Sequence, residues 1–362
     1  MGSLERKLEH IRICLERNVE SAGLSAGFRD VYLVHSCLPG LDLDEVSLEA
    51  EFLGRRFSAP IVISALTGGP QLSTHINESL ARASQELNIP LELGSQRPAI
   101  EDPSLRESFR QVRDLAPDSF IVANVGAVQA ASKGIEFVKE AVDMVEADAV
   151  AIHLNPLQEA VQPEGEACFR GVLEAIRRLS DQVGVPVIVK ETGCGVAREE
   201  AAALERAGAS AIDIAGAGGT SWGAIEAYRA LGRGDEEGYQ LGMAFRDWGV
   251  PTVVSIVEVR HSTRLPIIGS GGVRSGVDAA KAIALGADLA GMALPLLKPA
   301  LVGSWAVVEV LRRTMRELKL AMFLTGSRRV EDLKRARVVV TGMVAEWLRA
   351  RGLDVSALAL RG

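Results

Sequence analysis

The feature of this sequence that most restricts its fold is a regular alternation of short aliphatic runs with longer amphipathic segments. The runs lie at residues 59–64, 91–93, 120–124, 149–152, 185–189, 211–214, 265–268 and 288–292. Runs that are apolar on nearly every residue are typical of parallel strands covered on both faces. Segments such as 73–87, 197–207 and 276–285 have helical spacing, and Gly208 and Gly286 follow helix ends as caps commonly do. The pattern predicts a parallel α/β fold.

Eight strand–helix units over roughly 240 residues predict a (β/α)₈ TIM barrel. The alternative is an open, doubly wound sheet. We favour the barrel because glycine-rich strand ends recur at five of the eight runs, whereas an open sheet concentrates them at one switch point. We expect residues 1–58 to form an N-terminal extension with a helix and short strands at 31–34 and 49–53. Residues 59–300 would form the barrel, and residues 301–362 would form C-terminal helices packing on it.

Charge and cysteine usage exclude several classes of function. The net charge is −7, which argues against broad binding of nucleic acids or anionic membranes. The four cysteines are scattered and no CxxC pair occurs, so neither a zinc site nor a cysteine-held iron–sulfur cluster is indicated. No signal peptide and no apolar run of membrane-spanning length is evident. These features predict a cytoplasmic protein that acts on a small molecule.

Two glycine-rich segments follow the last two predicted strands. One contains Gly271, Gly272, Val273 and Arg274, and the other spans 291–295. Exposed backbone N–H groups at helix N-termini bind phosphate, and glycine allows close approach. In barrels, the loops after strands seven and eight commonly hold a phosphate. The pair therefore predicts a phosphate site, although either segment alone could be a tight turn.

Polar side chains mark the ends of other strands. His153, Asn155, Gln158 and Glu159 follow the fourth predicted strand, and Lys190 ends the fifth. Lys190 either meets a ligand or forms a salt bridge with Glu191 or Asp213, because a lone buried ammonium is costly. Glu159 could be a solvated charge or could bind Mg²⁺ together with substrate phosphates. His153 could be structural or could contact a substrate.

A basic face is predicted on the first helix. Arg6, Lys7 and His10 have spacings that place them on one side, and Arg97 follows the second strand. They could together bind a diphosphate, although a basic helix face is usually only solvated.

Six motifs together resemble the type 2 isopentenyl diphosphate isomerases, which are FMN-dependent barrels. They lie at 6–10, 66–69, 94–97, 152–159, 215–222 and 270–274, and the stretch 153–165 is the most specific. The resemblance implies conversion of isopentenyl diphosphate to dimethylallyl diphosphate in isoprenoid biosynthesis. It also implies reduced FMN, NAD(P)H as the reductant, Mg²⁺, and a homotetramer or homo-octamer.

The resemblance also implies roles for individual residues. The barrel would bind FMN, Glu159 would hold Mg²⁺, and the catalytic candidates are Gln158, His153, His10 and Asn155. The substrate would meet Arg6, Lys7, Ser95, Gln96, Arg97 and Gln158. FMN would be lined by Ala65, Leu66, Thr67, Ser95, Asn124, Lys190, Thr220, Gly271, Gly272, Val273, Arg274, Ala293 and Leu294. Leu66 and Cys194 depart from the family's common Met and Asn, which could shift flavin affinity.

The main alternative is an FMN-dependent 2-hydroxy-acid oxidase or dehydrogenase. Such an enzyme needs a histidine base near the end of strand seven, where this chain has none; His261 precedes that strand. Inosine monophosphate dehydrogenase would need a cysteine where Thr220 and Ser221 stand. Glutamate synthase would need cluster cysteines. A non-enzymatic barrel would be expected to lack these polar strand ends.

Overall fold

The computed structural model, which describes residues 3–66 and 71–361, contains a closed barrel of eight parallel strands. The barrel closes where Ala290 pairs with Ile61. Its strands follow chain order: β4 (Ile61–Ile63), β5 (Leu91–Glu92), β6 (Ile121–Gly126), β7 (Ala149–Leu154), β8 (Val187–Glu191), β9 (Ala211–Asp213), β10 (Ile267–Ser270) and β11 (Leu289–Met292). All eight predicted runs are therefore barrel strands. The barrel prediction is confirmed, and the open-sheet alternative is wrong.

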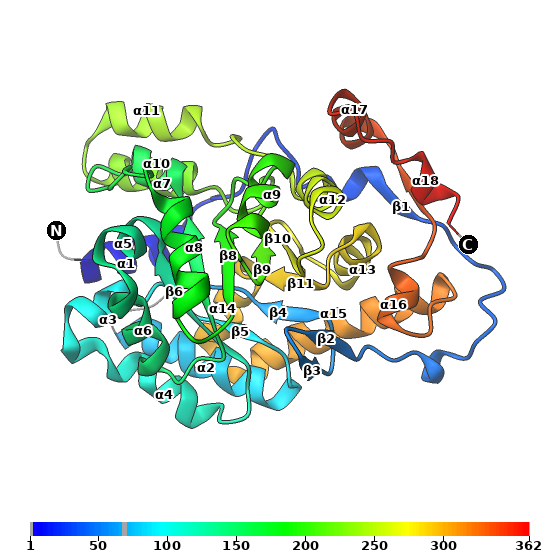
Figure 1. Ribbon diagram of the computed structural model, residues 1–362, viewed down its shortest axis with the longest axis horizontal. Coiled ribbons are helices and arrows are strands. Elements are labelled where there is room, and N and C mark those ends of the chain that lie inside the picture. Colours follow the sequence, from blue (N-terminus) through cyan, green and yellow to red (C-terminus); the bar gives the residue numbers. More distant parts are fainter. Residues whose placement is uncertain (1–2, 67–70, 362) are drawn as a thin grey trace.

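Helices surround the strands (Figure 1). The predicted helical segments correspond to α2 (Gln71–Leu87), α9 (Arg198–Arg206) and α13 (Gly276–Leu285). Gly208 and Gly286 follow two of these helices with φ of 83° and 121°, a backbone region that favours glycine. The remaining barrel helices are α3 (Arg97–Glu101), α4 (Glu107–Leu115), α5 (Ala127–Lys133), α6 (Ile135–Met144), α7 (Pro156–Val161), α8 (Val172–Gln182), α10 (Trp222–Gly232), α11 (Glu236–Ala244), α12 (Thr252–Ser262), α14 (Leu294–Val302) and α15 (Ser304–Leu324).

The two ends of the chain meet outside the barrel. The N-terminal part contains α1 (Ser3–Glu16), β1 (Val31–Leu33) and a hairpin of β2 (Ala50–Phe52) and β3 (Arg55–Phe57). Both short strands predicted in this part are present. The C-terminal part contains α16 (Val330–Leu333), β12 (Val338–Val340), α17 (Gly342–Ala350) and α18 (Ser356–Ala359). Strand β12 pairs antiparallel with β1, so a short strand that the sequence did not predict lies among the C-terminal helices. The three-part division of the chain stays a prediction.

The core is aliphatic, and the residues of β4, β6 and β8–β11 are buried throughout. Within residues 3–66 and 71–361, no helix has the length and apolar character to cross a membrane.

Candidate active site

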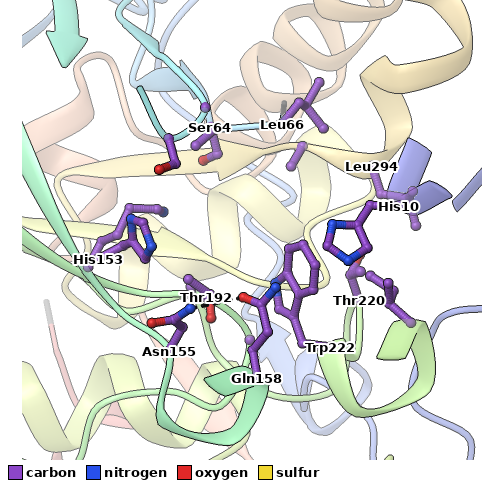
Figure 2. Close-up of a pocket in the computed structure, with 18 of the residues that line it drawn as sticks. His10, Ser64, Leu66, His153, Asn155, Gln158, Thr192, Thr220, Trp222 and Leu294 are labelled. Atoms are coloured by element: carbon purple, nitrogen blue, oxygen red, sulfur yellow. Dashed lines mark hydrogen bonds between the residues drawn. The ribbon is translucent and has the colours of Figure 1, made fainter. Parts of the chain in front are cut away.

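One large cavity lies at the carboxyl ends of the barrel strands, and residues of α1 form part of its lining. It encloses about 1650 Å³ of empty space, counting its open mouth. In Figure 2, Ser64 and Leu66 lie on one side of the cavity and Asn155 and Gln158 on the other. Predicted site residues lining it are Arg6, Lys7, His10, Ala65, Leu66, Ser95, Arg97, Asn124, His153, Asn155, Gln158, Glu159, Lys190, Thr220, Gly271, Gly272, Arg274, Ala293 and Leu294. The barrel thus gathers side chains from most of the predicted motifs.

Helix α1 brings its basic face to the cavity. The Lys7 ammonium donates to the backbone carbonyl of Ser95 at 2.7 Å. Burial, together with the neighbouring charge of Arg6, lowers the pKa of Lys7 to about 7. His10 lies edge-on to Trp222, with ring centroids 5.2 Å apart (Figure 2). The basic face is therefore directed at the cavity and not only at solvent.

A buried ion-pair network on α10 holds helix α1 in place. Glu226 contacts His10 Nε2 at 2.8 Å and Arg229 at 2.8 Å. Arg229 also contacts Glu164 at 2.6 Å and Glu9 at 3.0 Å. Burial alone would raise the pKa of Glu226, but His10 and Arg229 outweigh it and hold that pKa below its usual value. Sequence reasoning missed this network. The three-residue spacing of Glu226 and Arg229 was the available signal, but it does not reveal that α1 lies beside them.

His153 is held as a neutral ring. Its Nδ1 lies 2.7 Å from Asn124 Oδ1, and the Asn124 amide donates to the Leu93 carbonyl at 2.9 Å. Because that amide nitrogen is already a donor, its oxygen must accept, so the proton sits on Nδ1 of His153. Burial, then the charges of Lys190 and Lys7, lowers the pKa of His153 to about 3. Nε2 is therefore left as a hydrogen-bond acceptor.

The polar residues after His153 form one connected group. Asn155 donates to Gln158 at 3.0 Å and to Glu159 Oε1 at 3.1 Å. The other Glu159 oxygen accepts from the backbone N–H of Glu166 at 2.6 Å. The Glu159 carboxylate is thus fixed in place at the wall of the cavity, where a cation could reach it.

Lys190 forms a buried salt bridge and also lines the cavity. Its ammonium contacts Asp213 and lies 3.4 Å from Glu92. Glu191 is not its partner, because that carboxylate accepts from the N–H groups of Thr192 and Gly193, both at 2.6 Å. Of the two salt bridges considered from the sequence, the one with Asp213 is formed.

Glycines let two strand-end loops touch through their backbones. A Cβ on Gly219, after β9, would stand 2.3 Å from the nitrogen of Gly272, after β10. Gly271 and Gly272 have φ of 98° and 71°, which other residues rarely adopt. The loops form a side-chain-free cradle at the cavity. Nearby, the buried Ser64 hydroxyl has no hydrogen-bond partner among the described residues. A cradle of bare backbone with a free hydroxyl fits a flavin phosphate and ring.

Comparison with known proteins identifies the family. The family model for FMN-dependent dehydrogenases matches residues 139–340. A protein of Methanosarcina barkeri called isopentenyl-diphosphate delta-isomerase is 50% identical, covering 99% of this chain and 98% of its own length. One of the same name from Thermococcus kodakarensis is 51% identical over 96% of this chain and 94% of its own. The chain belongs to the isopentenyl-diphosphate delta-isomerase family.

Two solved structures with the same barrel are oxidases. A Pediococcus acidilactici lactate oxidase matches this isomerase-family chain with a TM-score of 0.65 at 18% identity, covering 89% of this chain and 88% of its own. A mandelate oxidase matches with a TM-score of 0.63 at 20% identity, covering 89% of this chain and 94% of its own length. At this identity the match shows the fold alone. The histidines lining the described part of the cavity are His10 and His153, and neither follows β10, as a 2-hydroxy-acid oxidase would require.

Three residues expected at the isomerase-family site do not line the described cavity. Gln96 is fully buried, and its amide donates to the Ala141 carbonyl and accepts from the Asn124 backbone, each at 2.9 Å. It therefore supports Asn124 from behind. Val273 is buried in the core, and Thr67 lies outside the described residues.

Proposed function

We propose that this protein converts isopentenyl diphosphate to dimethylallyl diphosphate, using reduced FMN and Mg²⁺, with NAD(P)H as the reductant. One observation carries the proposal. A single cavity combines a glycine cradle and a buried lysine on the barrel with three basic side chains, Arg6, Lys7 and Arg97. The first group suits a flavin and the second suits a diphosphate.

The substrate offers the protein little to hold except its diphosphate. Binding energy must therefore come from charges on that group. Lys7 and Arg6 on α1, together with Arg97 on α3, would bind its oxygens. Glu159 would hold Mg²⁺, which commonly binds through one carboxylate plus phosphate oxygens and water.

The double bond moves when one carbon gains a proton and another loses one. When bound and reduced, FMN would supply an electron-rich ring that can take part in that proton movement. The chain's own groups would orient the substrate. His153 offers a neutral hydrogen-bond acceptor at Nε2. Gln158 offers a side-chain amide whose oxygen already accepts a hydrogen bond from Asn155. Trp222 and Leu294 line the same cavity and would exclude water from the hydrocarbon end.

The test begins with the purified protein. We expect a yellow flavin spectrum and, after dithionite reduction, Mg²⁺-dependent conversion of isopentenyl diphosphate. Colourless protein that stays inactive with added FMN would contradict the proposal. Glu159→Gln should retain FMN but lose at least about tenfold in kcat/KM at limiting Mg²⁺, because even indirect metal partners cost about that much. The matched control is Glu199→Gln on α9, where the carboxylate pairs with Arg351 outside the cavity.

A further inference from the structure

An acidic side chain lies inside the barrel directly behind Lys190. Glu92, on β5, is 1% exposed, and its Oε2 lies 3.4 Å from the Lys190 ammonium. Asp213, on β9, contacts the same ammonium. One cation thus lies between two buried carboxylates. Burying one more negative than positive charge is costly, which favours a proton on one of the two acids.

The two carboxylates do not have equal numbers of hydrogen-bond and ion-pair partners among the described residues. One oxygen of Asp213, Oδ2, contacts the Lys190 ammonium. The other, Oδ1, accepts hydrogen bonds from the Ser270 hydroxyl at 2.5 Å and from the Ala215 N–H at 3.3 Å. Among the described residues, the only partner of Glu92 besides Lys190 is the Ala65 N–H, at a long 3.4 Å. Its Oε1 has no hydrogen-bond partner among the described residues. Glu92 is therefore the acid that more readily keeps a proton.

The charges facing Glu92 support this assignment. Burial raises the pKa of Glu92 to about 7; Lys190 opposes the rise and Asp213 adds to it. The neighbouring strands β4 and β6 contribute no ionisable side chain. Because Asp213 is the better hydrogen-bonded of the two acids, a proton held here near neutral pH belongs mainly to Glu92.

This group is in contact with the cavity. Lys190 lines the cavity, and so does Ser64, which follows β4 beside Glu92, since Ile63 pairs with Leu91. The Ser64 hydroxyl also has no partner among the described residues. A negative charge placed in the cavity near Lys190 would draw the ammonium toward it. Glu92 would then lose its counter-ion and bind a proton more tightly.

We propose that Glu92 takes up a proton when electrons enter a flavin bound beside Lys190, so that the barrel interior compensates the charge of the reduced ring. This inference rests on the proposed function. The ring accepts two electrons and one proton and becomes a monoanion, and the Glu92 carboxylate accepts a second proton and becomes neutral. The sum is two electrons and two protons, with no net charge added. The electrons come from the hydride donor or, in the test, from dithionite.

The pH dependence of the flavin midpoint potential follows from the titration of Glu92. Below pH 7, Glu92 is already protonated beside oxidised flavin, so reduction takes up one proton. Above pH 7 it is ionised beside oxidised flavin and becomes protonated on reduction, so two protons are taken up. The dependence of midpoint potential on pH should therefore steepen above pH 7. Ionisation of the reduced ring alone would make that dependence shallower instead.

The experiment is redox potentiometry of the FMN-loaded protein between pH 6 and 9. Between about pH 7.5 and 9, we expect two protons per two electrons in the wild type and one in Glu92→Gln, which halves the slope. The comparison variant is Glu191→Gln, since burial also raises the pKa of Glu191 to about 7. That variant should keep the wild-type slope. Equal slopes in wild type and Glu92→Gln, or a halved slope only in Glu191→Gln, would overturn the inference.

A second measurement needs no variant. At pH 8.5, the reduced-minus-oxidised infrared spectrum of the wild type should show a new protonated carboxylic acid band. Its absence would overturn the inference even if Glu92→Gln failed to fold. An isomerisation assay on the same preparation distinguishes failure of the proposed function from failure of the proposed proton uptake by Glu92. Protein that binds FMN and isomerises substrate, but takes up one proton per two electrons above pH 7, retains the proposed function and loses only this inference.

Discussion

At the scale of single residues, burial sets the charge of Lys7. Its half-buried ammonium lies against the loop after β5, where the Ser95 carbonyl is its hydrogen-bond acceptor. Burial, then the charge of Arg6, lowers its pKa to about 7. In the ligand-free protein, Lys7 is therefore largely neutral above pH 7. A diphosphate brought next to it would restore the proton, because an opposite charge favours the ionised amine.

We predict that diphosphate binding takes up a proton at pH 8.5 and almost none at pH 6. At pH 8.5 the Mg²⁺-bound diphosphate has already lost its last proton, because the bound cation favours the ionised form, so the proton goes to Lys7. Binding should accordingly weaken as pH rises above 7. Calorimetry in two buffers with different ionisation enthalpies, using inorganic diphosphate with Mg²⁺, measures the uptake directly.

Lys7→Arg is the matched control, because a guanidinium stays protonated over this pH range. The variant should bind diphosphate without taking up a proton at pH 8.5. If it takes up as many protons as the wild type, the titrating group is not Lys7.

Among the secondary-structure elements, the connection from α7 to α8 lies beside the cavity. Carboxylates in this connection bind neighbouring side chains. Glu166 contacts Arg97 at 2.8 Å, and its N–H donates to Glu159 at 2.6 Å. Glu164 reaches Arg229 on α10 at 2.6 Å. The connection therefore links the side chain proposed to hold Mg²⁺ with one proposed to bind diphosphate. Gly165 lies between the two carboxylates, and a Cβ there would stand 2.0 Å from the Glu159 carbonyl oxygen.

We predict that Gly165→Ala lowers kcat/KM by about 100-fold, because a misplacement of about 1 Å can cost that much. The loss should appear mainly as a higher Mg²⁺ requirement, with FMN retained. The control is Gly232→Ala at the end of α10, where nothing lies within 4 Å of a Cβ. It should leave activity unchanged. Equal kinetics for both variants would show that the connection does not position Glu159.

At the scale of the whole molecule, one strand pair joins the two extensions. Leu33 of β1 pairs with Val338 of β12, and Val31 pairs with Val340. Val31 and Val338 are fully buried, whereas Val339 is 38% exposed. In Figure 1, β1 lies near α17 and α18, away from the N-terminus. The segment that follows α1 is therefore held partly by β12, from the C-terminal part of the chain.

We predict that Val338→Ala lowers the free energy of unfolding by about 2 kcal/mol, through lost burial and a residual cavity. Val339→Ala, on the exposed side of the same strand, should change it by less than about 0.5 kcal/mol. Urea unfolding of the two apoproteins, followed by circular dichroism, tests the difference. A larger effect at Val339 would contradict the strand register.

Local pattern was sufficient for most of the barrel. The strands are apolar runs covered on both faces, and the helices have 3.6-residue spacing, so both appear in the sequence without knowledge of their neighbours. β12 escaped prediction because three residues gain their stability from β1, about 300 positions away in the chain. A strand that short has no periodicity of its own to detect.

The eight strands, the strand ends at which polar residues gather and, through the motifs, the family can all be inferred from the sequence. Which of these side chains meet depends on the folded chain. It paired Lys190 with Asp213 and Glu92 and turned Gln96 away from the cavity. It also placed Glu226 against His10 on α1. Such contacts depend on barrel register and helix packing between distant segments, where a shift of one residue would turn each strand side chain to the other face.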